Sequence, residues 1–179
     1  RSWIEKLSSF QSISRIEPTG TLRRGDKLLQ SIELLVQANS SELLKELNDK
    51  LDCSFSESHS IVIKDATGMP VHLWVTTPES FNAQQLIRTG GEVYAQQLQS
   101  LYGSKAEAAI QALTQAGVAS LSSEKTLCNS IGIQWIEPEL RDAYETFPED
   151  LKLIDQGDIK GAFHAHSTWS DGRNSLEEM

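Results

Sequence analysis

The sequence has 179 residues, of which 39% are hydrophobic and 23% charged, a composition typical of a globular protein with one ordinary domain or two small ones. Its net charge of −9 disfavours a general nucleic-acid binder. The apolar runs are too short to span a bilayer, no signal segment opens the chain, and Cys53 and Cys128 fit neither a disulfide framework nor a zinc site. We therefore expect a cytoplasmic protein with no membrane partner.

Charge is unevenly distributed along the chain. Residues 1–37 hold six Lys and Arg against four Asp and Glu, whereas residues 82–150 hold four against nine. A polyanion would therefore meet the first part more readily than the second.

The first half of the chain alternates between helix and strand patterns. Apolar spacing predicts a helix over 3–10, an extended segment from 13, a turn or helix start at 18–21 and a strand over 28–36. A capped helix over 40–52 follows, then strands over 59–66 and 69–77 around a Thr67-Gly68 turn. This order predicts an α+β fold, a mixed sheet with helices on one face.

From residue 82 onward the pattern changes to short helices. Gly90-Gly91 interrupts the first of them, and serine caps predict further helices over 105–116 and from 122 or 123 to about 132. Residues 133–136 read as extended, and Pro138 begins a helix through 144. The predicted organisation is 1–81, 82–150, and a linker with one final strand over 151–179.

The predicted core consists of apolar residues on the buried faces of these elements. They are Trp3, Ile32, Leu34, Val36, Leu44, Leu47, Ile61, Ile63, Val71, Leu73, Val75, Leu98, Leu101, Ile110, Leu113, Leu121, Leu127 and Ile131. Trp135 and Trp169 fit either core or linker packing, or stacking platforms for nucleic-acid bases.

The last twenty residues carry the most suggestive chemistry. In a strand over 158–166 His164 and His166 point to the same face, and Asp171 follows in a loop that could fold back. Two imidazoles and a carboxylate form part of a metal site. The alternative is a pair of half-buried histidines beside a turn.

Several short stretches, taken in order, resemble motifs of family X DNA polymerases. Residues 20–25, Gly-Thr-Leu-Arg-Arg-Gly, are similar to the Gly-Ser-x-Arg-Arg-Gly segment of that family, and 30–36 are similar to its Gly-Asp-Ile-Asp-Leu-Leu-Val strand. Residues 70–75 resemble the strand that carries its third aspartate. Ser80-Phe81 and Thr89-Gly90 resemble its palm-to-thumb junction, and 136–141 resemble its Ile-Pro-Pro-Glu-Leu-Arg.

This resemblance implies a nucleotidyltransferase-like palm over 1–81 and a small helical or α+β thumb over 82–150. It also implies phosphate-binding roles for a glycine, a hydroxyl and arginines, which suit an anionic ligand. The residues at those positions are Gly20, Thr21, Arg23, Arg24, Thr89 and Gly90. The alternative for the two arginines is a solvated turn.

The departures from the family pattern concern catalysis. A two-metal palm needs three carboxylates around ions about 3.5–4 Å apart, and Mg²⁺ prefers oxygen ligands. The matching positions here are Ser31, Glu33 and His72, so three formal negative charges fall to one. Gln30, Ile87-Arg88 and Ala95 also depart from the family's residues. We expect no intact catalytic site in this palm.

The tail resembles the opening motif of PHP-family phosphoesterases, His-x-His-Ser/Thr followed by Ser-Asp-Gly, which follows the polymerase core in bacterial members. It implies that His164, His166 and Asp171 are ligands for a divalent metal such as Zn²⁺, Mn²⁺ or Mg²⁺. Ala162 stands where that family commonly has an aspartate. The remaining ligands would come from later strands, so we expect no cofactor in the 179 residues alone.

Three functional hypotheses follow. The first is a non-catalytic palm and thumb that braces its own PHP domain or weakly binds DNA or nucleotide phosphates. The second is an active nucleotidyltransferase in which Glu33 and His72 hold a softer ion such as Mn²⁺ or Zn²⁺. The third is a plain interaction module whose acidic helical half binds a protein.

Overall fold

The structure is a computed structural model that describes residues 3–51, 53–55, 60–64, 67–103, 123–142, 153–161 and 165–178. The chain divides into two compact units, residues 1–147 and 148–179.

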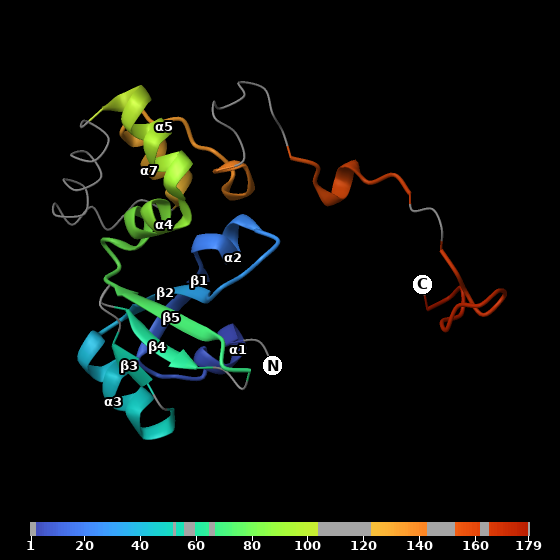
Figure 1. Cartoon of the computed structure of the whole chain (residues 1–179), viewed down its shortest axis with the longest axis horizontal. Helices are drawn as coiled ribbons and strands as arrows, with labels where there is room; N and C mark the ends of the chain where they lie inside the picture. Colours follow the sequence, from blue (N-terminus) through green and yellow to red (C-terminus); the bar gives the residue numbers. More distant parts are fainter. Residues whose placement is uncertain are drawn as a thin grey trace. The chain divides into compact units, whose positions relative to one another are not determined.

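The first unit is built on a five-stranded sheet with the order β1-β2-β5-β4-β3 (Figure 1). The strands are β1 (Ile13–Pro18), β2 (Ile32–Ala38), β3 (Cys53–Phe55), β4 (Ile61–Lys64) and β5 (Pro70–Thr76). The central pair, β2 and β5, is parallel, and the other three pairs are antiparallel. This mixed sheet with its helices confirms the predicted α+β class.

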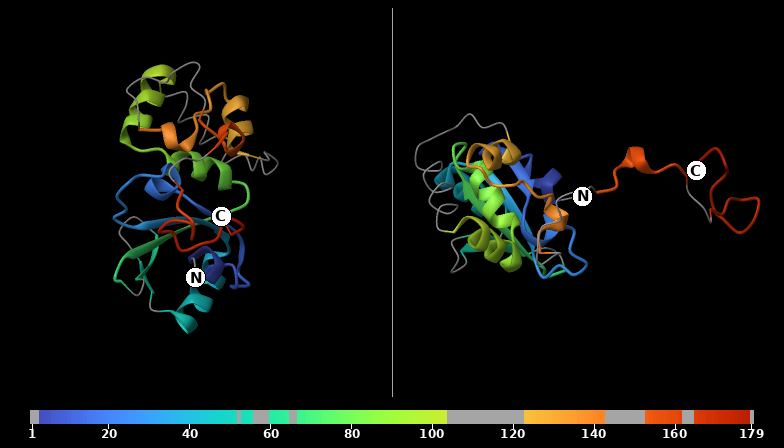
Figure 2. Two further views of the ribbon diagram at one scale, coloured as in Figure 1. Left: turned by 90° about the vertical axis from the view of Figure 1, so that its right-hand side faces the viewer. Right: turned by 90° about the horizontal axis from the view of Figure 1, so that it is seen from above.

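Short helices connect and follow the strands (Figure 2). They are α1 (Trp3–Leu7), α2 (Gly20–Arg24), α3 (Ser40–Lys50), α4 (Phe81–Thr89), α5 (Glu92–Tyr102), α7 (Glu124–Ser130), and the 3-10 helices η1 (Pro138–Leu140) and η2 (Gln156–Asp158). The Asn39 side chain caps α3, and Ser123 caps α7, which satisfies backbone N–H groups at the first turn. None of the described helices is long and apolar enough to cross a membrane.

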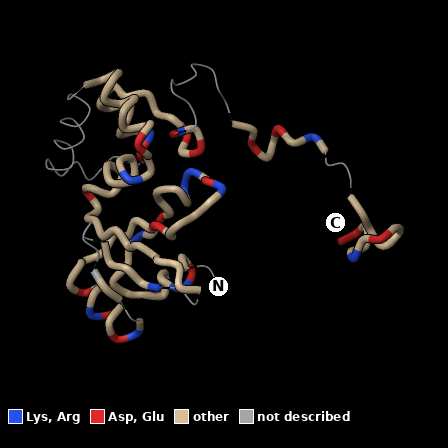
Figure 3. The backbone as a smooth tube through the Cα atoms, in the orientation of Figure 1, with Lys and Arg blue, Asp and Glu red and all other residues tan. Residues whose placement is uncertain are grey.

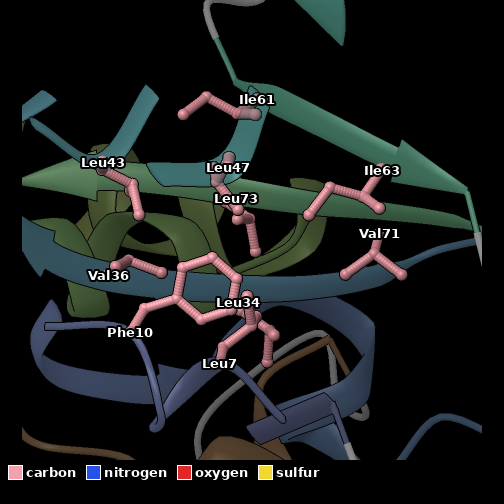
Figure 4. Packing of buried hydrophobic residues seen from close by; sticks show 10 residues of the cluster. All are labelled: Leu7, Phe10, Leu34, Val36, Leu43, Leu47, Ile61, Ile63, Val71 and Leu73. Atoms are coloured by element: carbon pink, nitrogen blue, oxygen red, sulfur yellow. The ribbon is translucent and has the colours of Figure 1, made fainter. Parts of the chain in front are cut away.

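The main core lies between one face of the sheet and two helices. Leu34 and Val36 of β2 pack with Leu73 of β5 against Leu7 of α1 and Leu43 of α3 (Figure 4). The prediction placed the helices on one face of the sheet. Helices α1 and α3 cover that face, while α2 and α4 lie along β2 on the other side (Figure 1).

On the central strands, the residues that alternate with these core residues face the other side of the sheet. Leu35, between Leu34 and Val36, is also fully buried, because the second face of β2 is covered as well. Glu33 of β2 and His72 of β5 share the face of Leu35, since side chains alternate along a strand. Glu33 and His72 therefore lie on the face turned toward α2 and α4.

A second hydrophobic cluster joins the helices after the sheet. Ala83 and Leu86 of α4 pack with Tyr94 of α5 and with Leu127 and Cys128 of α7, together with Ile133 and Ile136. Trp135 packs against this cluster. This agrees with the predicted alternative of core or linker packing. Residues 133–136, predicted to be extended, are in neither a helix nor a strand.

Some residues predicted to be core are only partly buried, and one of them, Leu101, is exposed. Leu101 is exposed, because α5 turns Tyr94 and Gln97 inward with Leu98 and Tyr102 beside them. Leu43 is fully buried where the prediction named Leu44, which only packs against the cluster edge. Trp3, Ile32, Val75, Leu98 and Ile131 are partly buried rather than central. Ile110, Leu113 and Leu121 lie outside the described residues.

Some element boundaries also differ from prediction. The strand predicted from Leu28 begins at Ile32, and the Leu28 side chain is 86% exposed. The helix predicted over 138–144 is a single 3-10 turn, because Arg141 takes an extended conformation to bury its side chain. The short strand β3 was not predicted, and the predicted helix over 105–116 lies outside the described residues.

The second unit contains little regular structure among its described residues. The Asp155 side chain caps η2, and residues 167–174 form a tight loop closed by a Thr168 N–H to Asn174 C=O hydrogen bond of 2.9 Å. The strand predicted over 158–166 falls partly on 162–164, which lie outside the described residues; the described residues on either side are irregular or in η2. Trp169 is 87% exposed within this unit, which contradicts core packing there.

Candidate functional site

The α2 turn is attached directly to strand β2. The Thr19 N–H donates to the Glu33 carbonyl at 2.9 Å, which ties the start of α2 to the strand. Gly20 has a left-handed φ of 58°, and Gly25 ends the helix at φ 72°. Thr21 accepts the Asp26 N–H through its carbonyl at 3.1 Å. This geometry presents Arg23 and Arg24 toward the helical elements.

Arg23 connects α2 to two other helices. One guanidinium nitrogen donates to Thr89 Oγ1 of α4 at 2.7 Å, and another donates to Glu124 Oε2 of α7 at 2.7 Å. Its side chain is about one-fifth exposed. Both ends of the guanidinium fork are therefore already occupied by groups of this chain.

Arg24 is more deeply buried and equally engaged. It donates to the Thr89 carbonyl at 2.9 Å and to Asp26 Oδ2 at 2.8 Å, and its Nη2 lies 3.9 Å from Asp142 Oδ2. The structure thus brings Arg23, Arg24 and Thr89 together; Gly20 begins the helix that carries the two arginines, and Gly90 follows Thr89. Acidic and basic residues are interleaved around this junction (Figure 3).

A buried ion-pair triad lies behind Arg23. The Arg141 side chain is fully buried and donates to Glu124 Oε1 at 2.8 Å, so Glu124 accepts from two arginines. Arg141 also donates through Nε and Nη2 to the Ile136 carbonyl. Sequence reasoning named neither Glu124 nor Arg141 as a site residue, although Arg141 closes one of the quoted motifs.

The three positions that match the family's catalytic carboxylates lie in or next to strands β2 and β5. Glu33 and His72 are register partners in the parallel β2–β5 pair, and Ser31 immediately precedes β2. The Trp74 indole N–H donates to Glu33 Oε2 at 3.3 Å, and His72 Nδ1 is hydrogen-bonded to Ser60 Oγ at 2.9 Å. One carboxylate and one imidazole therefore share this surface.

An arginine supplies positive charge beside Glu33. The Arg88 guanidinium lies 3.6 Å from the centre of the Trp74 ring, a close cation–π contact. Burial lowers the pKa of Arg88, and the nearby Glu33 carboxylate opposes that shift. The Glu33 charge is thus partly balanced by a side chain of the protein itself.

The donor set does not fit a two-ion magnesium centre. Within the described ranges, no three His, Cys, Asp or Glu residues are grouped so that they could hold a metal ion. Glu33 contributes two oxygens, and Nδ1 of His72 is already hydrogen-bonded. Hard Mg²⁺ prefers several oxygen ligands, and these two side chains do not provide them.

Two of the three predicted metal ligands in the tail lie in contact. His166 Nδ1 and Asp171 Oδ1 are 2.5 Å apart, with the imidazole about half exposed and the carboxylate largely exposed. Gly172 permits this loop, because a Cβ there would overlap the His166 carbonyl. His164 lies outside the described residues. The imidazole and carboxylate donors suit Zn²⁺ or Mn²⁺, but here they are hydrogen-bonded to each other.

Gly20→Ala is expected to lower the free energy of unfolding by about 1–3 kcal/mol. The left-handed φ costs about 1–2 kcal/mol for a residue with a Cβ, and that Cβ would lie 2.6 Å from Glu33 Oε1. Chemical denaturation measures the change. Gly25→Ala is the matched control, because Gly25 is also left-handed but has open space around its Cβ position. Equal losses in the two variants would contradict close packing of Glu33 on Gly20.

A known protein that resembles this chain comes from the family that the motifs indicated. The chain is similar to a Bacillus subtilis (strain 168) protein named DNA polymerase/3'-5' exonuclease PolX, with 27% identical residues over 98% of this chain. The chain spans about a third (33%) of that relative's length. No protein-family model matches the chain. The similarity supports the relationship to family X DNA polymerases that the motifs imply.

Proposed function

We propose that this chain is the palm and thumb portion of a family X DNA polymerase-like protein that carries out no nucleotidyl transfer of its own. In this proposal it acts in the cytoplasm as a scaffold for a C-terminal PHP phosphoesterase domain, and it holds nucleic-acid or nucleotide phosphates only weakly. The mixed sheet, the order of the motifs and the similarity to the Bacillus protein support the family relationship.

One observation carries the non-catalytic part of the proposal. Glu33 lies opposite His72 in the β2–β5 pair, and its carboxylate is engaged by Trp74 and accompanied by Arg88. A surface that clamps two divalent ions needs concentrated negative charge. Here a single carboxylate is already partly neutralised.

The engagement of Arg23 and Arg24 supports weak phosphate binding. Each guanidinium already donates to a carboxylate and to Thr89. An incoming phosphate would have to replace a short charge-assisted hydrogen bond with another of similar strength. The same contacts join α2 to α4 and α7, which suits a bracing role.

We further propose that residues 151–179 open a PHP domain. His164, His166 and Asp171 would hold a divalent metal there, with the other ligands supplied by later strands. Such a metal would supply Lewis-acid activation of water against a phosphoester. The relative's name includes a 3'-5' exonuclease, an activity that also cleaves phosphoesters. The partner of this palm would then be its own phosphoesterase domain.

Primer extension with Mg²⁺ and, separately, Mn²⁺ tests the proposal. We expect no incorporation by the wild-type chain, because two of the three required carboxylates are absent. A triple variant, Ser31→Asp with Glu33→Asp and His72→Asp, tests whether the charge is what is missing. Incorporation by the wild-type chain that Glu33→Ala abolishes would overturn the proposal.

That outcome would favour the second candidate, a nucleotidyltransferase with atypical ligands. The observation in its favour is that Glu33 and His72 lie on one face in direct register. A carboxylate with an imidazole suits Mn²⁺ or Zn²⁺ better than Mg²⁺. Activity restricted to Mn²⁺ and lost in both Glu33→Ala and His72→Ala would identify it.

A further inference from the structure

The face of the sheet that carries Glu33 and His72 already holds a cation of the protein. The Arg88 guanidinium of α4 lies 3.6 Å from the centre of the Trp74 ring. The Trp74 indole N–H donates in turn to Glu33 Oε2 at 3.3 Å. Stacking on an aromatic face stabilises a guanidinium that has lost part of its water. A positive charge, an aromatic ring and a carboxylate are therefore held together beside strands β2 and β5.

Arg88 is held in this place by packing and by its own helix. Its Nε donates to Gln84 Oε1 at 3.0 Å, one turn earlier in α4, and the residue is only partly exposed. Among the ion pairs of the described residues, none joins Arg88 directly to Glu33. Burial lowers the pKa of Arg88, and the Glu33 charge acts in the opposite direction. The guanidinium therefore balances the carboxylate through space rather than by a hydrogen bond.

Glu33 and His72 are the two donors that this face offers to an ion. They are register partners in the parallel β2–β5 pair, so their side chains leave the sheet on the same side. His72 Nδ1 is hydrogen-bonded to Ser60 Oγ at 2.9 Å, an arrangement that orients the ring and leaves Nε2 as the nitrogen for a metal. A carboxylate with an imidazole suits Mn²⁺, although two donors do not make a two-ion centre.

The balance of charge opposes an ion at these donors. A divalent ion bound to Glu33 would lie close to the Arg88 guanidinium, which stacks on the ring that contacts the carboxylate. Like charges in a partly buried site repel far more strongly than in water. One carboxylate cannot offset both cations. The shortage of carboxylates and the presence of Arg88 are therefore two separate obstacles to metal binding.

We propose that Arg88 excludes divalent ions from this face, because its guanidinium takes the place of the counter-ion beside Glu33 and closes a latent Mn²⁺ site formed by Glu33 and His72. The inference rests on the proposed function, since it concerns the same surface, and it adds a residue that determines which ions the surface accepts. If the shortage of carboxylates were the whole reason, removing the Arg88 charge would create no metal binding. If Arg88 excludes the ion, removing its charge opens the site.

The test is a titration of the full chain with Mn²⁺, followed through paramagnetic broadening of the Trp74 indole N–H resonance. The chain has four tryptophans, and Trp74→Phe identifies the resonance. We expect Arg88→Gln to bind Mn²⁺ at this position at least about tenfold more tightly than wild type. Adding Glu33→Gln or His72→Ala to Arg88→Gln should reverse the gain.

Two matched controls separate the charge of Arg88 from its shape. Arg88→Lys keeps the positive charge and should bind Mn²⁺ as weakly as wild type. Arg15→Gln removes another arginine that lies over an aromatic ring, that of Phe81 at 4.0 Å. The carboxylate paired with Arg15 is Glu17, so this variant should leave the Mn²⁺ response of Trp74 unchanged.

Arg88→Met keeps an unbranched side chain beside the Trp74 ring without the charge, so the test does not depend on the folding of Arg88→Gln alone. Mn²⁺ affinities of Arg88→Gln and Arg88→Met equal to that of wild type would overturn the inference. Arg88→Lys binding as tightly as Arg88→Gln would also overturn it. So would micromolar binding of Mn²⁺ beside Trp74 in wild type, a measurement that needs no variant.

The outcomes for the two proposals are distinguishable. A missing gain of Mn²⁺ binding removes the role of Arg88 and leaves the non-catalytic palm standing. Primer extension by the wild-type chain removes the non-catalytic palm, whatever the Mn²⁺ titrations of the variants give.

Discussion

Replacing Glu124 with alanine is expected to lower the free energy of unfolding by about 3–5 kcal/mol, the usual cost of leaving a buried charge uncompensated. Glu124 accepts from Arg23 at 2.7 Å and from the fully buried Arg141 at 2.8 Å. Among the described residues, the variant would leave the Arg141 guanidinium with the Ile136 carbonyl as its one remaining acceptor. The loss should exceed that of any exposed ion pair in the first unit.

Denaturant unfolding followed by circular dichroism gives the size of the loss. Glu139→Ala is the matched control, because Glu139 is exposed on η1 and should change stability by less than about 0.5 kcal/mol. Adding Arg141→Met to Glu124→Ala should recover part of the loss, since an apolar replacement removes the unpaired charge. A Glu124→Ala variant as stable as Glu139→Ala would show that the triad does not hold α7 to α2.

Leu43→Ala is expected to destabilise the first unit by about 2–5 kcal/mol through lost burial and a residual cavity. Leu43 is fully buried between α3 and the sheet, where it packs with Leu47 and Leu73 (Figure 4). Leu44, the next residue, lies about 100° further around the helix and packs only against the edge of the cluster. The same substitution at Leu44 should therefore have a smaller effect.

The two leucine variants form an internal comparison. Both remove the same atoms from adjacent positions of one helix, so helix propensity cancels between them. Thermal and denaturant midpoints measured side by side report the difference in burial alone. A larger loss for Leu44→Ala would mean that α3 presents the face named from the sequence rather than the face seen in the structure.

The sequence could predict the order of the elements, because periodicity and caps are local signals. The alternation of Ile61 and Ile63, the Thr67-Gly68 turn and the Ser40-Ser41 cap residues all lie close to the elements that they define, although the residue that caps α3 is Asn39. The three-residue strand β3 carries too few positions for a periodic pattern. The choice between Leu43 and Leu44 was ambiguous for a different reason, since both belong to the same apolar stripe.

The sequence could predict some of the residues that form the candidate site, but not the partners to which they are hydrogen-bonded. The motifs named Arg23, Arg24 and Thr89, and in the structure both arginines donate hydrogen bonds to Thr89. The partners Glu124 and Asp142 could not be foreseen, because Glu124 lies 101 residues from Arg23. No local pattern distinguishes a buried acid that pairs across the fold from a solvated one.

The roles proposed for Ser31, Glu33 and His72 depend on charge rather than on shape. The strand register that joins Glu33 to His72 is a property of the fold, whereas metal binding is a property of the side chains it carries. A sheet can therefore have this strand register whether or not it carries a full set of catalytic carboxylates.

The most direct test of this account is a crystal of the chain soaked with a nucleoside triphosphate and Mg²⁺, with Mn²⁺ as an anomalous marker. The account predicts no pair of ions beside Glu33 and His72, with the Trp74 indole still hydrogen-bonded to the Glu33 carboxylate. Two octahedrally coordinated ions about 3.5–4 Å apart at that surface, bridging the phosphates, would contradict it.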